Sequence, residues 1–273
     1  MFRRALFPTD FSAYSTRERT LVVVLAHPDD ESFAIGGTLA RYAAEGVAVH
    51  LIVATLGEAG IPGKEPREAA AIRQSELLMA CGALGIRTLE FLGFADGQLS
   101  EIDDESAVAR LLDTLRRARP DVVITFGPDG ISGHPDHLAV HRWTTAAFDR
   151  LSRLPGGPRR LYYIAPSPAT EQGCGVPPAA ESVGGPVAFI DVGRFLVTKV
   201  RAAQQHRSQH PPFVGQPEFE AQRLACHEVF RLARPISHEN TGAPVDDLFA
   251  GMDQASDPSE SADKEPEHEY TIA

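Results

Sequence analysis

Histidine and acidic residues gather directly after an apolar run near the start of the chain. Residues 21–25 read Leu-Val-Val-Val-Leu, and residues 26–31 read Ala-His-Pro-Asp-Asp-Glu. A β-branched run that stops at such residues is typical of a buried strand that ends at an open edge. Bare burial of these carboxylates would be very costly, so we expect them to face a cleft, a cation, or both.

A second group of the same residue types follows a later apolar run, at 121–126. The loop after this run contains His134, Asp136 and His137. A histidine, a carboxylate and a second histidine from separate loops form the N/O donor set that catalytic zinc uses, with one position left for water. An aspartate beside a ligand, but not needed as one, could take a proton from that water.

The spacing within residues 26–31 separates metal binding from proton acceptance. His27 and Asp30 are three positions apart, so a helical bend after Pro28 would bring both to one side and turn Asp29 elsewhere. The simpler alternative is that each acid caps a helix and each histidine is a packed or surface residue. Capping explains the pattern poorly, because one aspartate would suffice at each strand end.

The two motifs together resemble the signature motifs of a known enzyme family. Ala-His-Pro-Asp-Asp-Glu at 26–31 and His-Pro-Asp-His at 134–137 are similar to those of the PIG-L/LmbE-like family of zinc-dependent N-acetylglucosaminyl deacetylases. The resemblance extends over roughly residues 20–209. It implies a Rossmann-like fold and a small-molecule amino-sugar conjugate as the partner, typically an N-acetylated glucosamine that carries a further aglycone.

The same resemblance implies a role for each motif residue. It implies one divalent metal ion per chain, Zn²⁺ with other divalent metals as the alternative, and three protein ligands: His27, Asp30 and His137. Asp29 would be the general base. His134, oriented by Asp136, would stabilise the oxyanion and could protonate the leaving amine. We expect Glu31 to contact a ligand histidine.

Three further side chains are candidate substrate contacts. Glu58 follows the second expected strand, and Asp96 could accept a hydrogen bond from a sugar hydroxyl. Arg73, with Glu76, lies in a segment that resembles the family's Arg-x-x-Glu-Leu helix, and its guanidinium could reach sugar hydroxyls or a phosphate. The alternatives are an ion pair between Arg73 and Glu76, and an ordinary Asp-Gly turn at Asp96.

Three other positions modify this interpretation. His141 lies four residues after His137, but three ligands already leave the required open position, so we expect His141 to be structural. Residues 206–209 resemble the family's His-x-Ser-Gln element and should shape the pocket. Some family members, including those of mycothiol-type biosynthesis, carry a tyrosine where this chain has Ser132, which argues against a mycothiol-type substrate.

Alternating apolar runs and helical segments predict how these loops are positioned. Strands are expected at 20–26, 47–54, 87–92 and 121–126, and helices at 38–45, 67–84, 103–119 and up to about 150. This order predicts an α/β fold: a Rossmann-like, doubly wound, mostly parallel sheet with helices on both faces and the active site at the carboxyl edge of the strands. Later segments predict strands at 160–165 and 187–192, and helices at 195–206 and 218–233.

Length and composition predict the domain organisation. The 273 residues are 43 % hydrophobic, which suffices for one full core. We expect an N-terminal arm at 1–19, a single deacetylase domain at 20–245, and an acidic, disordered tail at 246–273. The oligomeric state is left open.

Charge and cysteine content limit the possible partners and location. The formal net charge of −11 argues against nonspecific binding to nucleic acid or anionic membranes. No apolar run approaches the roughly 20 residues of a membrane span, and none of signal-peptide length follows Arg3 and Arg4. The three cysteines include no Cys-x-x-Cys pair, so we expect packing residues in a reducing compartment and a cytoplasmic location.

The sequence therefore predicts a metal-dependent hydrolase that removes an N-acetyl or N-acyl group from a glucosamine-type conjugate. One alternative is a related amide hydrolase of the conjugate-amidase type. Another is a Rossmann-like sugar- or nucleotide-binding module without turnover. A binding module would have no use for Asp29 beside a filled metal site, and no Gly-x-Gly-x-x-Gly follows the first strand.

Overall fold

One eight-stranded sheet organises the part of the chain that the structure describes. The structure is a computed structural model, and it describes residues 5–6, 18–165, 187–213, 215–222, 224–235 and 244–252. The strands are β1 (Ala5–Leu6), β2 (Thr20–Leu25), β3 (Ala48–Thr55), β4 (Thr88–Phe94), β5 (Val122–Phe126), β6 (Arg160–Ala165), β7 (Val187–Asp191) and β8 (His227–Arg234). They lie in the order β1-β4-β3-β2-β5-β6-β8-β7.

The middle of this sheet is parallel, and its edges are antiparallel. Strands β4, β3, β2, β5 and β6 pair in parallel, whereas β1 joins β4, and β8 joins β6 and β7, in the antiparallel direction. The structure thus confirms the predicted mostly parallel, doubly wound fold. Strand β2 marks the point where the strand order reverses, and in such sheets ligands bind beyond the carboxyl ends of the strands at this point.

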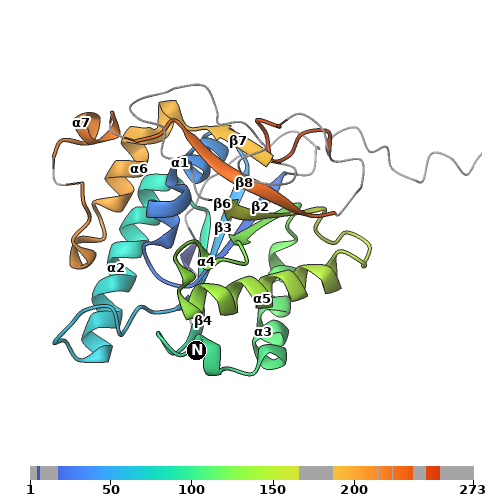
Figure 1. Cartoon of the computed structure of the whole chain (residues 1–273), viewed down its shortest axis with the longest axis horizontal. Coiled ribbons are helices and arrows are strands. Elements are labelled where there is room, and N and C mark those ends of the chain that lie inside the picture. Colours follow the sequence, from blue (N-terminus) through green and yellow to red (C-terminus); the bar gives the residue numbers. More distant parts are fainter. Residues whose placement is uncertain are drawn as a thin grey trace, which may run out of the picture.

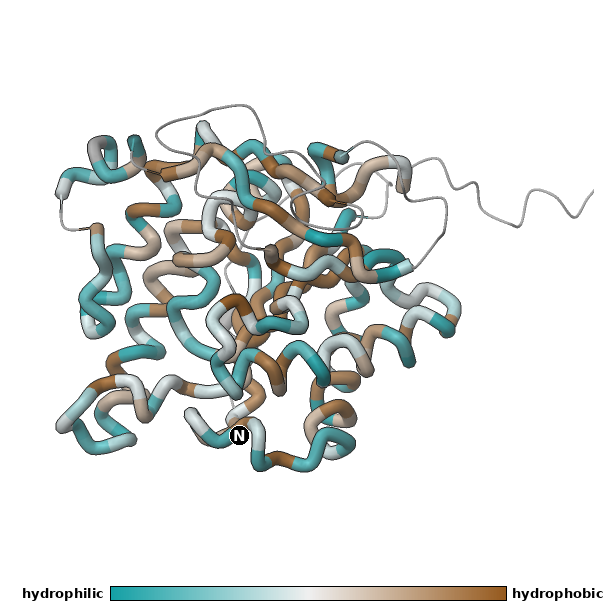
Figure 2. The backbone as a smooth tube through the Cα atoms, viewed as in Figure 1, coloured by the Kyte–Doolittle hydropathy of each residue, from teal (hydrophilic) through white to brown (hydrophobic). Residues whose placement is uncertain are grey.

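Helices cover both faces of the sheet (Figure 1). They are α1 (Asp30–Ala44), α2 (Pro66–Leu84), α3 (Asp104–Ala118), α4 (Gly130–Gly133), α5 (Pro135–Leu151), α6 (Leu196–Ala203) and α7 (Pro217–Ala221). Helices α1, α2 and α6 pack together, and α3 packs against α5 on the other side. Leu21–Leu25 is buried between the two layers, as expected for a strand covered on both faces. The apolar segments accordingly lie along the sheet (Figure 2).

Helix α1 consists of two pieces joined at Ile35, whose φ of −136° is not helical. The carboxylate of Glu228 accepts hydrogen bonds from the N–H groups of Gly37 (3.1 Å) and Thr38 (2.7 Å), so a β8 side chain caps the second piece. Lys199 Nζ donates to the same carboxylate at 2.6 Å. Gly37 is required here, because an added Cβ would lie 2.6 Å from the Val192 side chain.

The prediction of a helix over 218–233 is wrong. Helix α7 ends at Ala221, and β8 begins at His227. Val229 and Phe230 are buried, and the strand forms backbone hydrogen bonds with both β6 and β7. Pairing on both sides outweighs the local pattern that suggested a helix.

The predicted boundary of the tail at residue 246 is too early. Leu248 and Phe249 belong to the buried core, and the N–H of Leu248 donates to the Tyr42 hydroxyl at 2.7 Å. Residues 253–273, the rest of the predicted tail, lie outside the described residues, as does most of the predicted arm. In the described part of the arm, β1 pairs with β4.

The cysteines differ in part from the prediction of three packing residues. Cys81 is free and buried, but Cys226 is disulfide-bonded. Cys174 lies outside the described residues. The described helices include none that is long and apolar enough to cross a membrane.

Candidate active site

The structure brings His27, Asp30 and His137 together at the carboxyl ends of β2 and β5. His27 lies two residues after the end of β2 and is nearly buried. Its Nε2 lies 3.1 Å from Asp136 Oδ2 and 3.2 Å from Asp96 Oδ1. These carboxylates can only accept, so the ring donates through Nε2 and its Nδ1 is left as a possible metal donor. Although burial opposes the charged form, the hydrogen bonds to Asp136 and Asp96 raise the pKa of His27 to about 10, so an ion bound at Nδ1 would displace a proton from that nitrogen.

Asp30 is the first residue of α1 and faces both histidines. Its Oδ2 accepts from the N–H groups of His27 (2.8 Å) and Ala26 (3.2 Å), which fixes the carboxylate against the end of the strand. The same oxygen lies 3.7 Å from His27 Nδ1, and Oδ1 lies 3.4 Å from His137 Nε2. The i, i+3 spacing therefore brings His27 and Asp30 to the same side, as predicted.

His137 is held in the orientation that a ligand would need. Its Nδ1 lies 2.9 Å from the Gly130 carbonyl, and its ring stacks on Phe126 at 4.0 Å between centroids. Because Nδ1 donates to this carbonyl, Nε2 carries the free lone pair.

These three side chains fit a divalent metal ion. One donor atom from each of His27, Asp30 and His137 lies within 4.8 Å of the others. Two imidazole nitrogens and one carboxylate oxygen suit zinc and its neighbours among the transition metals. Each imidazole uses its other nitrogen to hold a fixed orientation, as metal-binding histidines usually do.

Asp29 points away from the three donors, toward Arg73. Its φ of 117° and ψ of −28° are rare for a residue other than glycine. Arg73 Nη2 donates to Asp29 Oδ2 at 3.0 Å. Burial and the neighbouring Asp30 carboxylate raise the pKa of Asp29 to about 7, and Arg73 opposes the rise. A carboxylate with a pKa in this range is suited to general-base catalysis near neutral pH.

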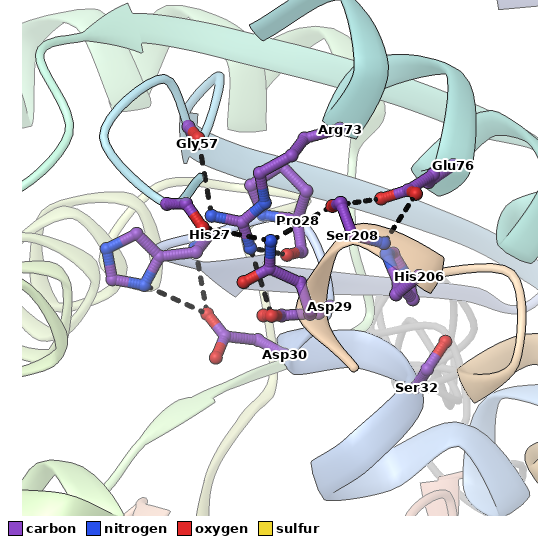
Figure 3. A network of polar contacts seen from close by, with 12 residues as sticks. His27, Pro28, Asp29, Asp30, Ser32, Gly57, Arg73, Glu76, His206 and Ser208 are labelled. Atoms are coloured by element: carbon purple, nitrogen blue, oxygen red, sulfur yellow. Dashed lines mark hydrogen bonds and ion pairs between the residues drawn. The ribbon is translucent and has the colours of Figure 1, made fainter. Parts of the chain in front are cut away.

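Arg73 is buried rather than extended toward solvent. Its guanidinium also donates to the Pro28 carbonyl and, at 3.4 Å, to the Gly57 carbonyl (Figure 3). The ion pair with Glu76, which was the alternative interpretation of Arg73, is absent among the described contacts, and Glu76 instead accepts from Ser208. The predicted sugar contact of Arg73 stays a prediction. The structure gives its guanidinium a different set of partners.

His134 lies at the start of α5, beside the three donors. Its Nδ1 accepts a hydrogen bond from the Asp136 N–H at 3.1 Å, so the neutral ring carries its proton on Nε2. Burial and the neighbouring rings of His27 and His137 lower the pKa of His134. The arrangement therefore presents a neutral N–H donor on an exposed side chain next to the rings of His27 and His137.

The Asp136 carboxylate forms no hydrogen bond with His134 in the described part of the chain, so its predicted orienting role stays a prediction. It is fully buried and accepts from Gly97 N (2.8 Å), Leu99 N (3.0 Å) and His27 Nε2. A carboxylate oxygen of Asp136 and a ring nitrogen of His134 lie within 4.8 Å of each other, in a group that also includes His27. The hydrogen bond between Asp136 and His134 runs from the Asp136 backbone N–H to His134 Nδ1.

Asp96 and Glu58 lie side by side at the same edge. Asp96 Oδ1 contacts His27, as described above, and Asp96 Oδ2 accepts from the Ala59 N–H at 3.0 Å. Glu58 Oε1 accepts from the Asp96 N–H at 2.9 Å. Their predicted contacts with substrate stay predictions. The contact of Asp96 with a candidate ligand was not predicted, because no sequence spacing links the loop after β4 to His27.

Glu31 contacts none of the candidate ligand histidines, so that prediction is wrong. Its side chain is fully buried, and Oε1 accepts from His206 Nε2 at 2.7 Å. Although burial opposes both charged forms, their attraction holds the pKa of Glu31 below its ordinary value and raises that of His206. The resemblance of residues 206–209 to a family element was the only sequence signal for this pair.

Two other predictions concern neighbouring positions. His141 Nδ1 lies 2.9 Å from the Phe126 carbonyl, and His141 belongs to none of the candidate metal groups among the described residues. The contact with the Phe126 carbonyl agrees with a structural role, which stays a prediction. Ser132 is exposed on the short helix α4.

Comparison with known proteins agrees with this geometry. The family model described as "PIG-L: GlcNAc-PI de-N-acetylase" matches residues 22–148. A 1D-myo-inositol 2-acetamido-2-deoxy-alpha-D-glucopyranoside deacetylase of Acidothermus cellulolyticus is 33 % identical over 88 % of this chain and 98 % of its own. The chain belongs to the PIG-L family of N-acetylglucosaminyl deacetylases. A protein of the same name from Rhodococcus jostii is 32 % identical over 86 % of this chain and 99 % of its own.

The fold of this PIG-L protein is also found among solved structures. The N,N'-diacetylchitobiose deacetylase of Pyrococcus horikoshii superposes with a TM-score of 0.61 and 21 % identity, over 79 % of this chain and 84 % of its own. Family membership confirms the predicted enzyme class, a deacetylase that acts on a glucosamine-type conjugate.

Proposed function

We propose that this chain is a zinc-dependent hydrolase that removes the acetyl group from an N-acetylglucosamine linked to an inositol-type polyol. The convergence of His27 Nδ1, an Asp30 oxygen and His137 Nε2 is the observation that carries the proposal. Similarity to the inositol-conjugate deacetylases along nearly their whole length supports the aglycone. It outweighs the single difference at Ser132, which had argued against this substrate class.

The proposed mechanism divides the work among the chain's own residues. A zinc ion held by His27, Asp30 and His137 would supply a Lewis acid and lower the pKa of a water molecule. Asp29 accepts a proton from the attacking water. The Nε2–H of His134 donates to the oxyanion that forms from the acetamide carbonyl. The proton held by Asp29 is then available to the leaving amine, and acetate and a free amine result.

The test is release of primary amine from a set of N-acetylglucosamine conjugates that differ only in aglycone. We expect the inositol conjugate to be the best substrate by kcat/KM. An N-acyl cysteine amide of a glucosamine conjugate belongs in the set, because its preferential cleavage would support the conjugate-amidase alternative. Absence of amine release from every conjugate, with metal bound, would contradict the proposal.

The assignment of Asp29 has its own test. Asp29→Asn removes the proton acceptor and keeps the side-chain volume, so kcat should fall by about 10²–10⁴-fold, the usual contribution of a general base. Bound zinc, measured by elemental analysis, should remain at the level of the unaltered enzyme. A variant with unaltered kcat would remove the role of Asp29 without affecting the rest of the proposal.

The location of the protein stays a prediction. The cytoplasm was expected from the composition of the chain, and fractionation of the native cells, followed by detection of the protein, tests it.

A further inference from the structure

Asp29 adopts a backbone conformation that needs outside support. At φ 117° a non-glycine residue is strained, and the surrounding structure must hold it in place. The side chain of Asp29 accepts no capping hydrogen bond from α1. The support must therefore come from elsewhere in the fold.

Two charged side chains supply it from opposite sides. Arg73 holds the Asp29 carboxylate and the preceding Pro28 carbonyl through one nitrogen, Nη2 (Figure 3). Glu31 holds the backbone, because its Oε2 accepts from the Asp29 N–H at 3.0 Å. This hydrogen bond joins the Asp29 backbone to the side chain of Glu31, two positions later, and so closes the turn that contains Asp29.

Glu31 is itself held by His206. The Glu31 side chain has no exposed surface, and its second oxygen accepts from His206 Nε2 and from Ser32 Oγ at 2.5 Å. His206 has no exposed surface either. A buried carboxylate keeps its charge and its position only when it is paired, so the place of Glu31 depends on His206.

The segment that carries His206 is anchored to the same helix as Arg73. Ser208 donates to Glu76 through its N–H (2.8 Å) and its hydroxyl (2.6 Å), and Glu76 lies one turn after Arg73 on α2 (Figure 3). Gln209 Nε2 donates to the Gly60 carbonyl at 3.1 Å. Residues 206–209 are thus fixed against the loop and helix that surround Asp29. Within the described part of the chain, they form no hydrogen bond or ion pair with the three candidate metal ligands.

We propose that the Glu31–His206 pair positions Asp29, so that residues 206–209 act on the reaction through the backbone of the proposed base. The inference rests on the proposed function, in which Asp29 accepts the proton of the attacking water. It makes His206 and Glu31 positioning residues, and it makes the pair distinct from the metal site.

The central experiment is a double-mutant cycle on kcat. His206→Gln keeps an N–H donor toward Glu31, but it shifts the position of this donor and removes the positive charge of the imidazolium. The resulting movement of Glu31 should displace Asp29. Displacements of about 1 Å at a catalytic group can cost on the order of 10²-fold, so we expect kcat to fall by about 10–100-fold with KM little changed. In the Asp29→Asn background the same change should alter the remaining rate by less than about two-fold, because the residue that it positions has already lost its function.

Metal affinity and stability are measured on the same variants. Zinc affinity from chelator competition should stay within about three-fold of the unaltered protein, since its ligands are untouched. Tyr42→Phe is the matched control. It removes a buried hydrogen-bonding group from α1, the helix that also carries Glu31, at a position far from Asp29 in sequence. It should lower the melting temperature and leave kcat unchanged.

Glu31→Gln provides the second variant in case His206→Gln does not fold. It keeps the shape of the side chain and removes the charge, and it should give the same pattern. An equal loss of kcat in the Asp29 and Asp29→Asn backgrounds would overturn the inference, as would unaltered kcat in both variants. A crystal structure of either variant with Asp29 unmoved would also overturn it, and this result does not depend on which substrate the enzyme uses.

Discussion

At the scale of single residues, the orientation of the two histidine rings determines what the site can bind. His27 donates through Nε2 to Asp136 and Asp96, and His137 donates through Nδ1 to a carbonyl. The two rings therefore present opposite nitrogens to Asp30. Motif spacing predicted which side chains would meet, but it could not predict the tautomers, because the groups that fix them come from loops distant in the sequence.

Asp136→Asn tests the dependence of the metal site on these fixed rings. The Asp136 carboxylate accepts three hydrogen bonds, and an amide would turn an N–H₂ group toward at least one of these donors. Loss of such a partner typically weakens metal binding by about 10–100-fold. We expect a change of this size in the zinc dissociation constant, measured by chelator competition.

His141→Gln is the control for that experiment. His141 follows on the same helix, but it contacts the Phe126 carbonyl rather than the candidate ligands. The zinc affinity of the His141→Gln variant should match that of the unaltered protein. If both variants bound zinc equally well, the supporting role of Asp136 would have to be abandoned.

At the scale of elements, α1 depends on a side chain from the far end of the sheet. Its second piece begins at the kink, and its free N–H groups are satisfied by Glu228 on β8. Sequence periodicity predicted a helix at 38–45, which is close to this second piece. It missed the first piece, because Gly36 and Gly37 favour a break, and only tertiary contacts extend the helix back to Asp30.

Glu228→Ala should therefore be strongly destabilising. The change leaves Lys199 buried without its partner and uncaps α1, and breaking one side of a buried pair typically costs about 3–5 kcal/mol. Urea unfolding gives the free energy of unfolding. Arg116→Ala, at an exposed ion pair with Asp113, serves as the comparison and should change stability by less than about 1 kcal/mol. Equal losses in the two variants would show that the buried pair has no special role.

At the scale of the whole molecule, the order of the strands brings the two motifs together. The motif at 26–31 follows β2 and the motif at 134–137 follows β5, and these strands are neighbours although about a hundred residues separate them. The alternation of strands and helices predicted this, because ligand sites lie where the order of a doubly wound sheet reverses. The later part of the chain was harder to predict, because β8 is defined by its partners in the sheet more than by its own pattern.

The C-terminal part of the described chain completes the core. Phe249 is buried and packs against Tyr42, with ring centroids 5.5 Å apart. Phe249→Ala should lower the free energy of unfolding by about 3–5 kcal/mol, as is usual for a buried aromatic side chain. Leu154→Ala, at an exposed position, should cost much less. If Phe249→Ala were as stable as Leu154→Ala in urea, this segment would not belong to the core.

The place of the candidate ligands at two neighbouring strand ends has a consequence for folding as well. An ion bound by His27, Asp30 and His137 would join two segments of the chain that are far apart in sequence, and it would bind the folded chain in preference to the unfolded one. At a free zinc concentration of a hundred times the dissociation constant, such binding adds about 2.7 kcal/mol to the stability of the fold. A chelator would then stop the reaction and lower the melting temperature together, so the supply of zinc would regulate the lifetime of the enzyme along with its activity.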